Sequence, residues 1–266
     1  MSTATTGGSS QAGTHSRAKV EAPRSGRRPL VGYLFMPVLL AVVLVTLWLW
    51  ARGEDLSSTE RQRVKPDFIL SAAWQHIVLT VVSTAIVLII AIPLGIVLTR
   101  PFARRITPYA IAVFNVGQGI PTVGLLALLV FVWTIGFWTV VVGLVAYCSL
   151  AVLRNTMVGL EQVDESVIEA ARGMGMTRRA VLTKIELPLA VPVMMAGVRT
   201  ALVINVGTAT LGTLFNAGGL GDIINTGITR SDELITVIGS VLVAVLALLI
   251  DYVAGVAEDV LRPRGL

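Results

Sequence analysis

The chain has 266 residues, of which 55% are hydrophobic and 14% charged, and its mean hydropathy is +0.81. These values exclude an ordinary soluble domain and indicate a polytopic membrane protein. The net charge of +5 comes from basic residues that flank apolar runs, which argues against nucleic acid as a partner. The single cysteine cannot form an internal disulfide, and with two separated histidines it offers no metal site.

The chain begins with a polar segment and a separate apolar run. Residues 1–29 are rich in Ser, Thr, Gly and Arg, and are predicted to be a disordered tail. Residues 30–50 form an apolar run, and a run of about 20 residues is enough to cross a bilayer. Residues 51–73 carry mixed charge and are predicted to be an external loop or short helix. Residues 255–266 are predicted to be a second tail.

Between these ends, residues 74–254 are predicted to be a core of five further membrane spans. The expected spans are 74–99, 108–132, 138–153, 189–214 and 234–254. The expected fold is therefore all-α, with six transmembrane helices. Pro121 lies within the third span, and a kink or local unwinding is expected there, because proline lacks an amide hydrogen and obstructs the preceding turn.

The basic residues predict the orientation of these spans. Fifteen of the 21 Lys and Arg residues fall in segments on one side, five fall on the other, and Arg199 lies within a span. Cytoplasmic segments of membrane proteins carry the excess of Lys and Arg. Both termini and the loop 154–188 are therefore predicted to lie in the cytoplasm.

The loop 154–188 is the one long charged interruption in the second half of the chain. Asp164 is a good N-cap for a first helix, and Gly175 can adopt the left-handed geometry that ends one. Thr177 can cap a second short helix, which Pro188 is expected to terminate. The pattern predicts a helix, a glycine turn and a second helix outside the bilayer.

Seven positions in this loop fit the spacing EAA-x3-G-x9-I-x-LP, namely Glu169, Ala170, Ala171, Gly175, Ile185, Leu187 and Pro188. The spacing resembles the EAA motif of the membrane subunits of binding-protein-dependent ABC importers. The resemblance implies that the loop is a coupling helix that docks in a groove of the ATPase, with the two alanines allowing close approach. An amphipathic helix lying on lipid is the alternative, but it explains neither the glycine spacing nor the Leu-Pro ending.

Polar groups inside the spans are expected to face a cavity, a partner helix or a subunit interface, because they are costly in lipid. The candidates for the substrate path are Asn115, Gln118, Pro121, Asn205 and Thr208. Helix–helix hydrogen bonding is the alternative for the three amides. Arg199 is expected to be structural, bonding backbone carbonyls or a carboxylate, and Asp251 is expected to reach headgroup water.

Three segments, residues 119–130, 169–201 and 207–222, also resemble permeases for quaternary-amine osmoprotectants. The resemblance implies the type I ABC importer fold and transport of glycine betaine, choline or carnitine across a bacterial cytoplasmic membrane. It further implies two ATPase subunits, a second permease subunit, identical or related, and a separate extracytoplasmic solute-binding protein.

Other functions compete with this interpretation. A permease of the same architecture could carry methionine or another amino acid, and a secondary transporter or channel would work without ATP. A membrane-bound enzyme is disfavoured, because no nucleophile, base and oxyanion group gather in the spans. The chain has no GxxxxGKS phosphate loop, so ATP binding is assigned to a separate subunit, and neither a catalytic residue nor a cofactor is expected.

Overall fold

A computed structural model describes residues 30–55 and 57–261, and every regular element in them is helical. The tail predicted over 1–29 lies outside the described residues, as do residues 262–266. The long helices are α1 Leu30–Gly53, α3 Pro66–Leu98, α6 Phe137–Glu161, α9 Leu187–Ala209 and α11 Glu233–Leu261. The shorter ones are α2 Ser58–Arg63, α4 Thr107–Gly119, α5 Thr122–Val132, α7 Glu165–Gly173, α8 Arg178–Val181 and α10 Gly221–Arg230.

Five of the helical segments are long and apolar enough to cross a membrane, and α4 with α5 adds a sixth, broken span. These two helices meet at an angle of 99°. A kink or local unwinding was expected at Pro121, and the chain has both a sharp bend and a short unwound stretch there. Both Ile120 and Pro121 have extended backbone, with ψ of 132° and 130°. Proline disfavours helical geometry in the residue before it as well, so two successive residues leave the helix here.

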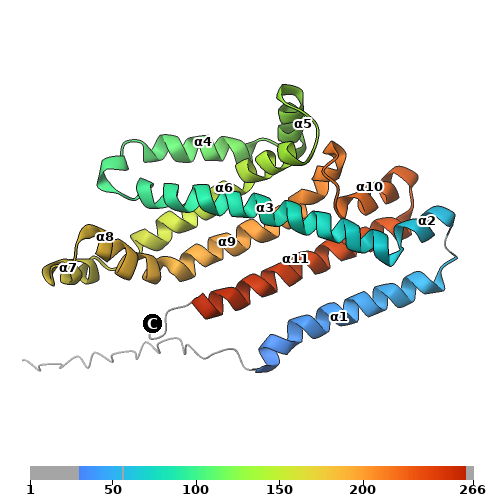
Figure 1. Cartoon of the computed structure of the whole chain (residues 1–266), viewed down its shortest axis with the longest axis horizontal. Coiled ribbons are helices and arrows are strands. Elements are labelled where there is room, and N and C mark those ends of the chain that lie inside the picture. The colour runs from blue at the N-terminus through green and yellow to red at the C-terminus, as the bar shows by residue number, and fades with distance from the viewer. Residues whose placement is uncertain (1–29, 56, 262–266) are drawn as a thin grey trace, which may run out of the picture.

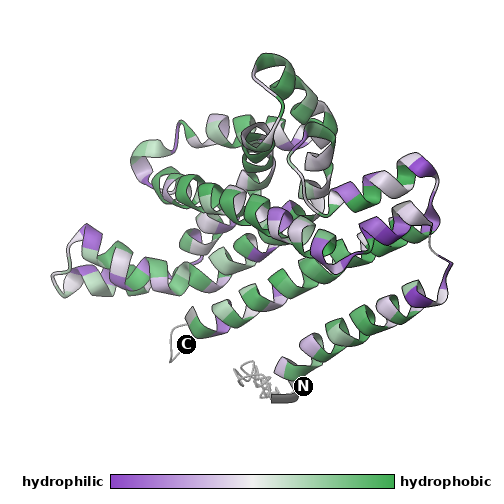
Figure 2. Cartoon of the chain, turned by 45° about the vertical axis from the view of Figure 1, so that its right-hand side comes forward, coloured by the Kyte–Doolittle hydropathy of each residue, from purple (hydrophilic) through white to green (hydrophobic). Residues whose placement is uncertain are grey.

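The long helices lie side by side and give the bundle two distinct ends. Helices α7 and α8 lie at one end, and α2 and α10 lie at the other (Figure 1). Hydrophobic residues dominate the long helices, whereas hydrophilic residues gather toward the ends (Figure 2). The start of α1 meets the end of α11, where the Tyr33 hydroxyl donates to Asp259 at 3.0 Å. The assignment of the α7–α8 end to the cytoplasm rests on the charge distribution.

Helices α3, α6 and α9 pack against one another at the centre of the bundle. Glycines allow their backbones to come close: a Cβ on Gly95 of α3 would lie 2.8 Å from Thr156 Cβ of α6. A Cβ on Gly159 of α6 would lie 3.0 Å from the Ala190 carbonyl oxygen of α9. Small residues at contacts are the usual means by which membrane helices approach closely. The three helices therefore form a closely packed unit.

Several helices continue beyond the apolar runs that predicted the spans. Residues 51–73, predicted to be an external loop or short helix, contain α2 and the start of α3 at Pro66. Helix α6 continues to Glu161 into the predicted loop, and α11 continues to Leu261 into the predicted tail. Hydropathy reports where the bilayer ends, whereas the helix is held by backbone hydrogen bonds that continue outside it.

Candidate functional site

Helix α7 begins at a carboxylate cap. The backbone N–H of Ser166 donates to Asp164 Oδ1 at 2.8 Å, which satisfies a donor that the first helical turn leaves without a partner. Hydrogen bonds from the Ser166 side chain and backbone hold the pKa of the Asp164 carboxyl below its ordinary value. The carboxylate charge also suits the positive end of the helix dipole. Asp164 is therefore the N-cap that the sequence predicted.

Helix α7 ends in a Schellman turn at Gly175. The Met176 N–H bonds to the Ala171 carbonyl at 3.2 Å, and the Gly175 N–H bonds to the Arg172 carbonyl at 2.9 Å. Gly175 has a φ of +84°, which is the left-handed geometry expected from the sequence. A Cβ at this position would meet nothing within 4 Å. The requirement for glycine is therefore conformational and not a matter of space.

The two alanines of the motif face in different directions. Ala170 is exposed beside the exposed Glu169, whereas Ala171 is 2% exposed and packs inside the chain. Of the two alanines expected to allow close approach, Ala171 therefore packs against other residues of this chain, and Ala170 is the exposed one. Val167 and Met174 are exposed as well, and with Ala170 they form one helical face. We call Val167, Ala170 and Met174 the α7 stripe. Sequence periodicity alone could not distinguish this stripe from a buried face.

The second half of the motif is built into the bundle. The Ala180 N–H donates to Thr177 Oγ1 at 3.3 Å and caps α8, as predicted. The prediction that Pro188 ends this helix is wrong, because α8 continues through a π-helical turn, Leu182–Glu186, into α9. The Leu187 N–H bonds to the Leu182 carbonyl, and Pro188 follows directly after the π-helical turn, at the second residue of α9.

The last three motif positions, Ile185, Leu187 and Pro188, are half-buried. Leu187 packs on the apolar cluster formed by Leu160, Ala190 and Met194. The structure thus divides the seven motif residues into two groups. Glu169 and Ala170 face outward with the α7 stripe, and the other residues shape the turn or anchor the segment.

Sequence reasoning missed a charged residue inside the motif. Glu186, between Ile185 and Leu187, is 4% exposed, and its Oε2 accepts from Arg100 Nη2 at 2.7 Å. Arg100 follows α3, 86 residues earlier in the chain. The sequence signal was a charge flanked by two apolar motif positions, and it carried no information about the partner.

Asn205 belongs to the contact between α9 and α3. It is fully buried, and its Nδ2 donates to Ser83 Oγ at 2.7 Å, to Thr84 Oγ1 at 2.8 Å and to the Thr80 carbonyl at 3.3 Å. A lining role for Asn205 therefore does not fit this structure. The alternative, helix–helix hydrogen bonding, matches its surroundings.

The other path candidates lie around the broken span and α9. Gln118 Nε2 donates to the Tyr147 carbonyl at 2.9 Å, and exposed Asn115 accepts from Arg154 at 2.9 Å. Pro121 is exposed at the break, and half-buried Thr208 donates to the Ile204 carbonyl at 2.8 Å. Within the part of the chain that the structure describes, no hydrogen bond joins any two of the five candidates.

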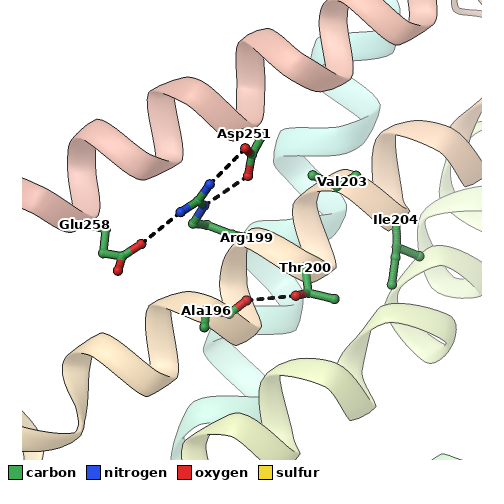
Figure 3. Close-up of a pocket in the computed structure, with 7 residues that line it drawn as sticks. All are labelled: Ala196, Arg199, Thr200, Val203, Ile204, Asp251 and Glu258. Carbon is green, nitrogen blue, oxygen red and sulfur yellow. Dashed lines mark hydrogen bonds and ion pairs between the residues drawn. The ribbon is translucent and has the colours of Figure 1, made fainter. Parts of the chain in front are cut away.

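Arg199 joins α9 to α11 through two carboxylates (Figure 3). Its Nε donates to Asp251 Oδ1 at 3.0 Å, and its Nη2 donates to Asp251 Oδ2 at 2.9 Å. Its Nη1 donates to Glu258 Oε2 at 3.3 Å. The structural role expected for Arg199, bonding a carboxylate, fits this geometry, and Asp251 is its closer partner. A cavity of about 450 Å³ opens beside these groups.

Comparisons with known proteins agree on one family. The family described as binding-protein-dependent transport system inner membrane component matches residues 91–264. The carnitine transport permease protein OpuCD of Listeria monocytogenes is 39% identical over 197 residues, which cover 74% of this chain and 87% of the relative. The osmoprotectant import permease protein OsmY of Salmonella typhimurium is 37% identical over 213 residues, which cover 80% of this chain and 88% of the relative. A further relative is the choline transport system permease protein OpuBB of Bacillus subtilis, which is 36% identical over 198 residues. This alignment covers 74% of this chain and 90% of the relative.

A solved structure matches the fold. The alignment with a chain of the MetNI methionine ABC transporter, in an inward-facing conformation, has a TM-score of 0.67 at 23% identity. It covers 78% of this chain and 100% of that chain. At this identity the likeness concerns the fold alone.

Proposed function

Because the chain belongs to the family of binding-protein-dependent transport system inner membrane components and has the type I ABC importer transmembrane fold, we propose that it imports quaternary-amine compatible solutes. It would act as the permease subunit for glycine betaine, choline or carnitine, in the service of osmoprotection. The relatives named for carnitine, choline and osmoprotectant transport support this solute class over methionine, because identity with them is 36–39% along most of their length.

The observation that carries the coupling role is the shape of residues 164–188, which we call the α7–α8 segment. It places Glu169 and the α7 stripe outward, at the bundle end that carries an excess of positive charge in the sequence. Such an exposed apolar stripe, lying outside the apolar spans, suits contact with a protein partner. We assign this partner to the ATPase subunit, which binds ATP and moves the segment.

The remaining partners follow from the importer class. Two permease subunits, identical or related, would enclose one path, and two ATPases would dock on their α7–α8 segments. A separate solute-binding protein would deliver the solute from outside the bacterial cytoplasmic membrane. Both termini of this chain would lie in the cytoplasm. The chain itself would catalyse no covalent step.

For the solute path we retain Asn115, Gln118, Pro121 and Thr208. The broken α4–α5 span has irregular backbone at Ile120 and Pro121, and such backbone is tolerated in membranes where it lines a cavity or is buried in protein. A quaternary ammonium favours aromatic faces, yet few aromatic residues lie within the spans away from their ends. We therefore place tight selection of the solute in the binding protein, with a weak polar passage here.

Uptake of labelled glycine betaine tests the proposal, in cells that carry this chain with its ATPase and binding protein and lack other uptake systems. Excess unlabelled betaine, choline or carnitine should compete, and methionine should not. Uptake should also vanish with an ATPase that binds but does not hydrolyse ATP. Competition by methionine alone would support the amino-acid alternative, and uptake without ATP hydrolysis would support a secondary transporter.

A further inference from the structure

One ion pair joins the motif to a distant corner of the bundle. Arg100 Nη2 lies 2.7 Å from Glu186 Oε2, and the side chains are 27% and 6% exposed, respectively. A buried carboxylate is strongly destabilising without its partner, because it has lost water and gained nothing in return. The Glu186 carboxylate is therefore held close to Arg100.

On one side, the pair is fixed to the corner between α3 and α4. Arg100 Nε donates to the Ile96 carbonyl at 3.2 Å, so the guanidinium is held against the last turn of α3. The corner itself is closed by Thr107, whose hydroxyl lies 2.9 Å from the Leu98 carbonyl and 3.0 Å from the Ala103 carbonyl. Any displacement of the guanidinium is thus shared by the end of α3 and the start of α4.

On the other side, the pair is fixed to the α7–α8 segment. Glu186 is the last residue of the π-helical turn that begins at Leu182, and this turn is continuous with α8. A π-helical turn inserts a residue into the helix, and such insertions are frequent at functional sites. Because the helix is unbroken from Arg178 to Glu186, a displacement of α8 is carried to the carboxylate.

Apolar packing around the ion pair cannot by itself fix the position of the α7–α8 segment relative to α3. Leu182 and Leu187 of the segment pack on the cluster of Leu160, Ala190 and Met194, and Ile92 and Ile96 of α3 pack on the same cluster. Apolar contacts are non-directional, so they hold the segment and α3 together without defining a geometry between two particular groups. A charged hydrogen bond has a defined geometry, and separating it leaves Glu186 buried and unpaired.

We propose that Arg100 and Glu186 are a positioning pair that makes the α3–α4 corner move with the α7–α8 segment. Motion of the ATPase then reaches the broken α4–α5 span through this pair, in addition to the direct path along α9. The inference rests on the proposed function, since it concerns how that transport is coupled to ATP. It adds Arg100 and Glu186 to the residues that the motif spacing identified.

The test compares neutral variants in the assembled complex. Glu186→Gln, Arg100→Gln and the double variant are reconstituted in liposomes with the ATPase and the binding protein. Glycine betaine uptake and ATP hydrolysis are then measured in the same sample. Arg104→Gln is the matched control, because Arg104 is an exposed arginine in the same corner.

Each single variant should lower the solute transported per ATP hydrolysed by about fivefold, the lower end of typical coupling between sites. The double variant should be no worse than either single variant, because both remove one shared interaction. The control should keep the wild-type ratio. The co-purified ATPase is quantified for each variant, so that loss of assembly is separated from loss of coupling.

Two results would overturn the inference. One is an unchanged ratio of transport to hydrolysis in both single variants, including the case where both activities fall only with the amount of assembled complex. The other is a double variant whose loss is the product of the single losses, since the residues would then act independently. Failure of the proposed function is a different result: the wild-type complex itself would take up no quaternary amine.

Discussion

Replacement of Gly175 gives the sharpest test of the α7–α8 segment. The residue has a φ of +84°, and left-handed geometry costs a residue with a Cβ about 1–2 kcal/mol. A Cβ would meet nothing within 4 Å, so this conformational cost is the whole expected effect in the isolated chain. A cost of this size lowers the ratio of the correctly turned segment to its alternatives by about 5–30-fold.

The expected loss of transport is smallest for Gly175→Asn, larger for Gly175→Ala and largest for Gly175→Val. Asparagine tolerates left-handed geometry best among these, and a β-branched residue tolerates it least. The assay is labelled glycine betaine uptake, together with the amount of ATPase that co-purifies with the inserted chain. Gly175→Val should give the largest loss of transport, while the chain remains inserted.

Gly173→Ala is the matched control. Gly173 is the last residue of α7, and a Cβ there also meets nothing within 4 Å, so alanine should be tolerated. Normal transport by Gly175→Val would refute the reasoning, as would an equal loss from Gly173→Ala. The first result would show that the turn is not required, and the second that any added side chain on this surface disturbs docking.

Three further predictions concern topology, the solute path and pH. A reporter active only in the periplasm, fused after Leu266, should be silent, and activity there would reverse the orientation. In a Cys148→Ala background, Gln118→Cys should react with small aqueous thiol reagents, whereas Asn205→Cys should stay inert. Reaction of Asn205→Cys alone would place the path on the opposite side of α9. Because the pKa of Asp164 is lowered in the folded segment, its stabilisation of α7 is present above the ordinary pKa of about 4 and is lost as pH falls through the lower folded value. Wild-type association with the ATPase should therefore weaken at acid pH more than that of Asp164→Asn, which keeps a capping side chain without titrating, and identical pH profiles would contradict the capping role.

The sequence by itself determined the features that depend on local physics. Apolar runs of sufficient length predicted the spans, and the break at Pro121 followed from proline's missing N–H and its effect on Ile120. The cap at Asp164 and the left-handed turn at Gly175 are likewise set by residues close in the chain. The motif spacing located the segment because all seven positions lie within twenty residues.

Only the tertiary structure decided which polar groups meet. Asn205 finds Ser83 at a separation of 122 residues, and Arg199 finds Asp251 at a separation of 52. Periodicity assigns a residue to a face of a helix, but it does not say which other helix covers that face. Ala171 shows the same limit, because its burial depends on packing outside α7. The pairing of Glu186 with Arg100 depends on how α3 and the start of α9 are brought together, which no local pattern encodes.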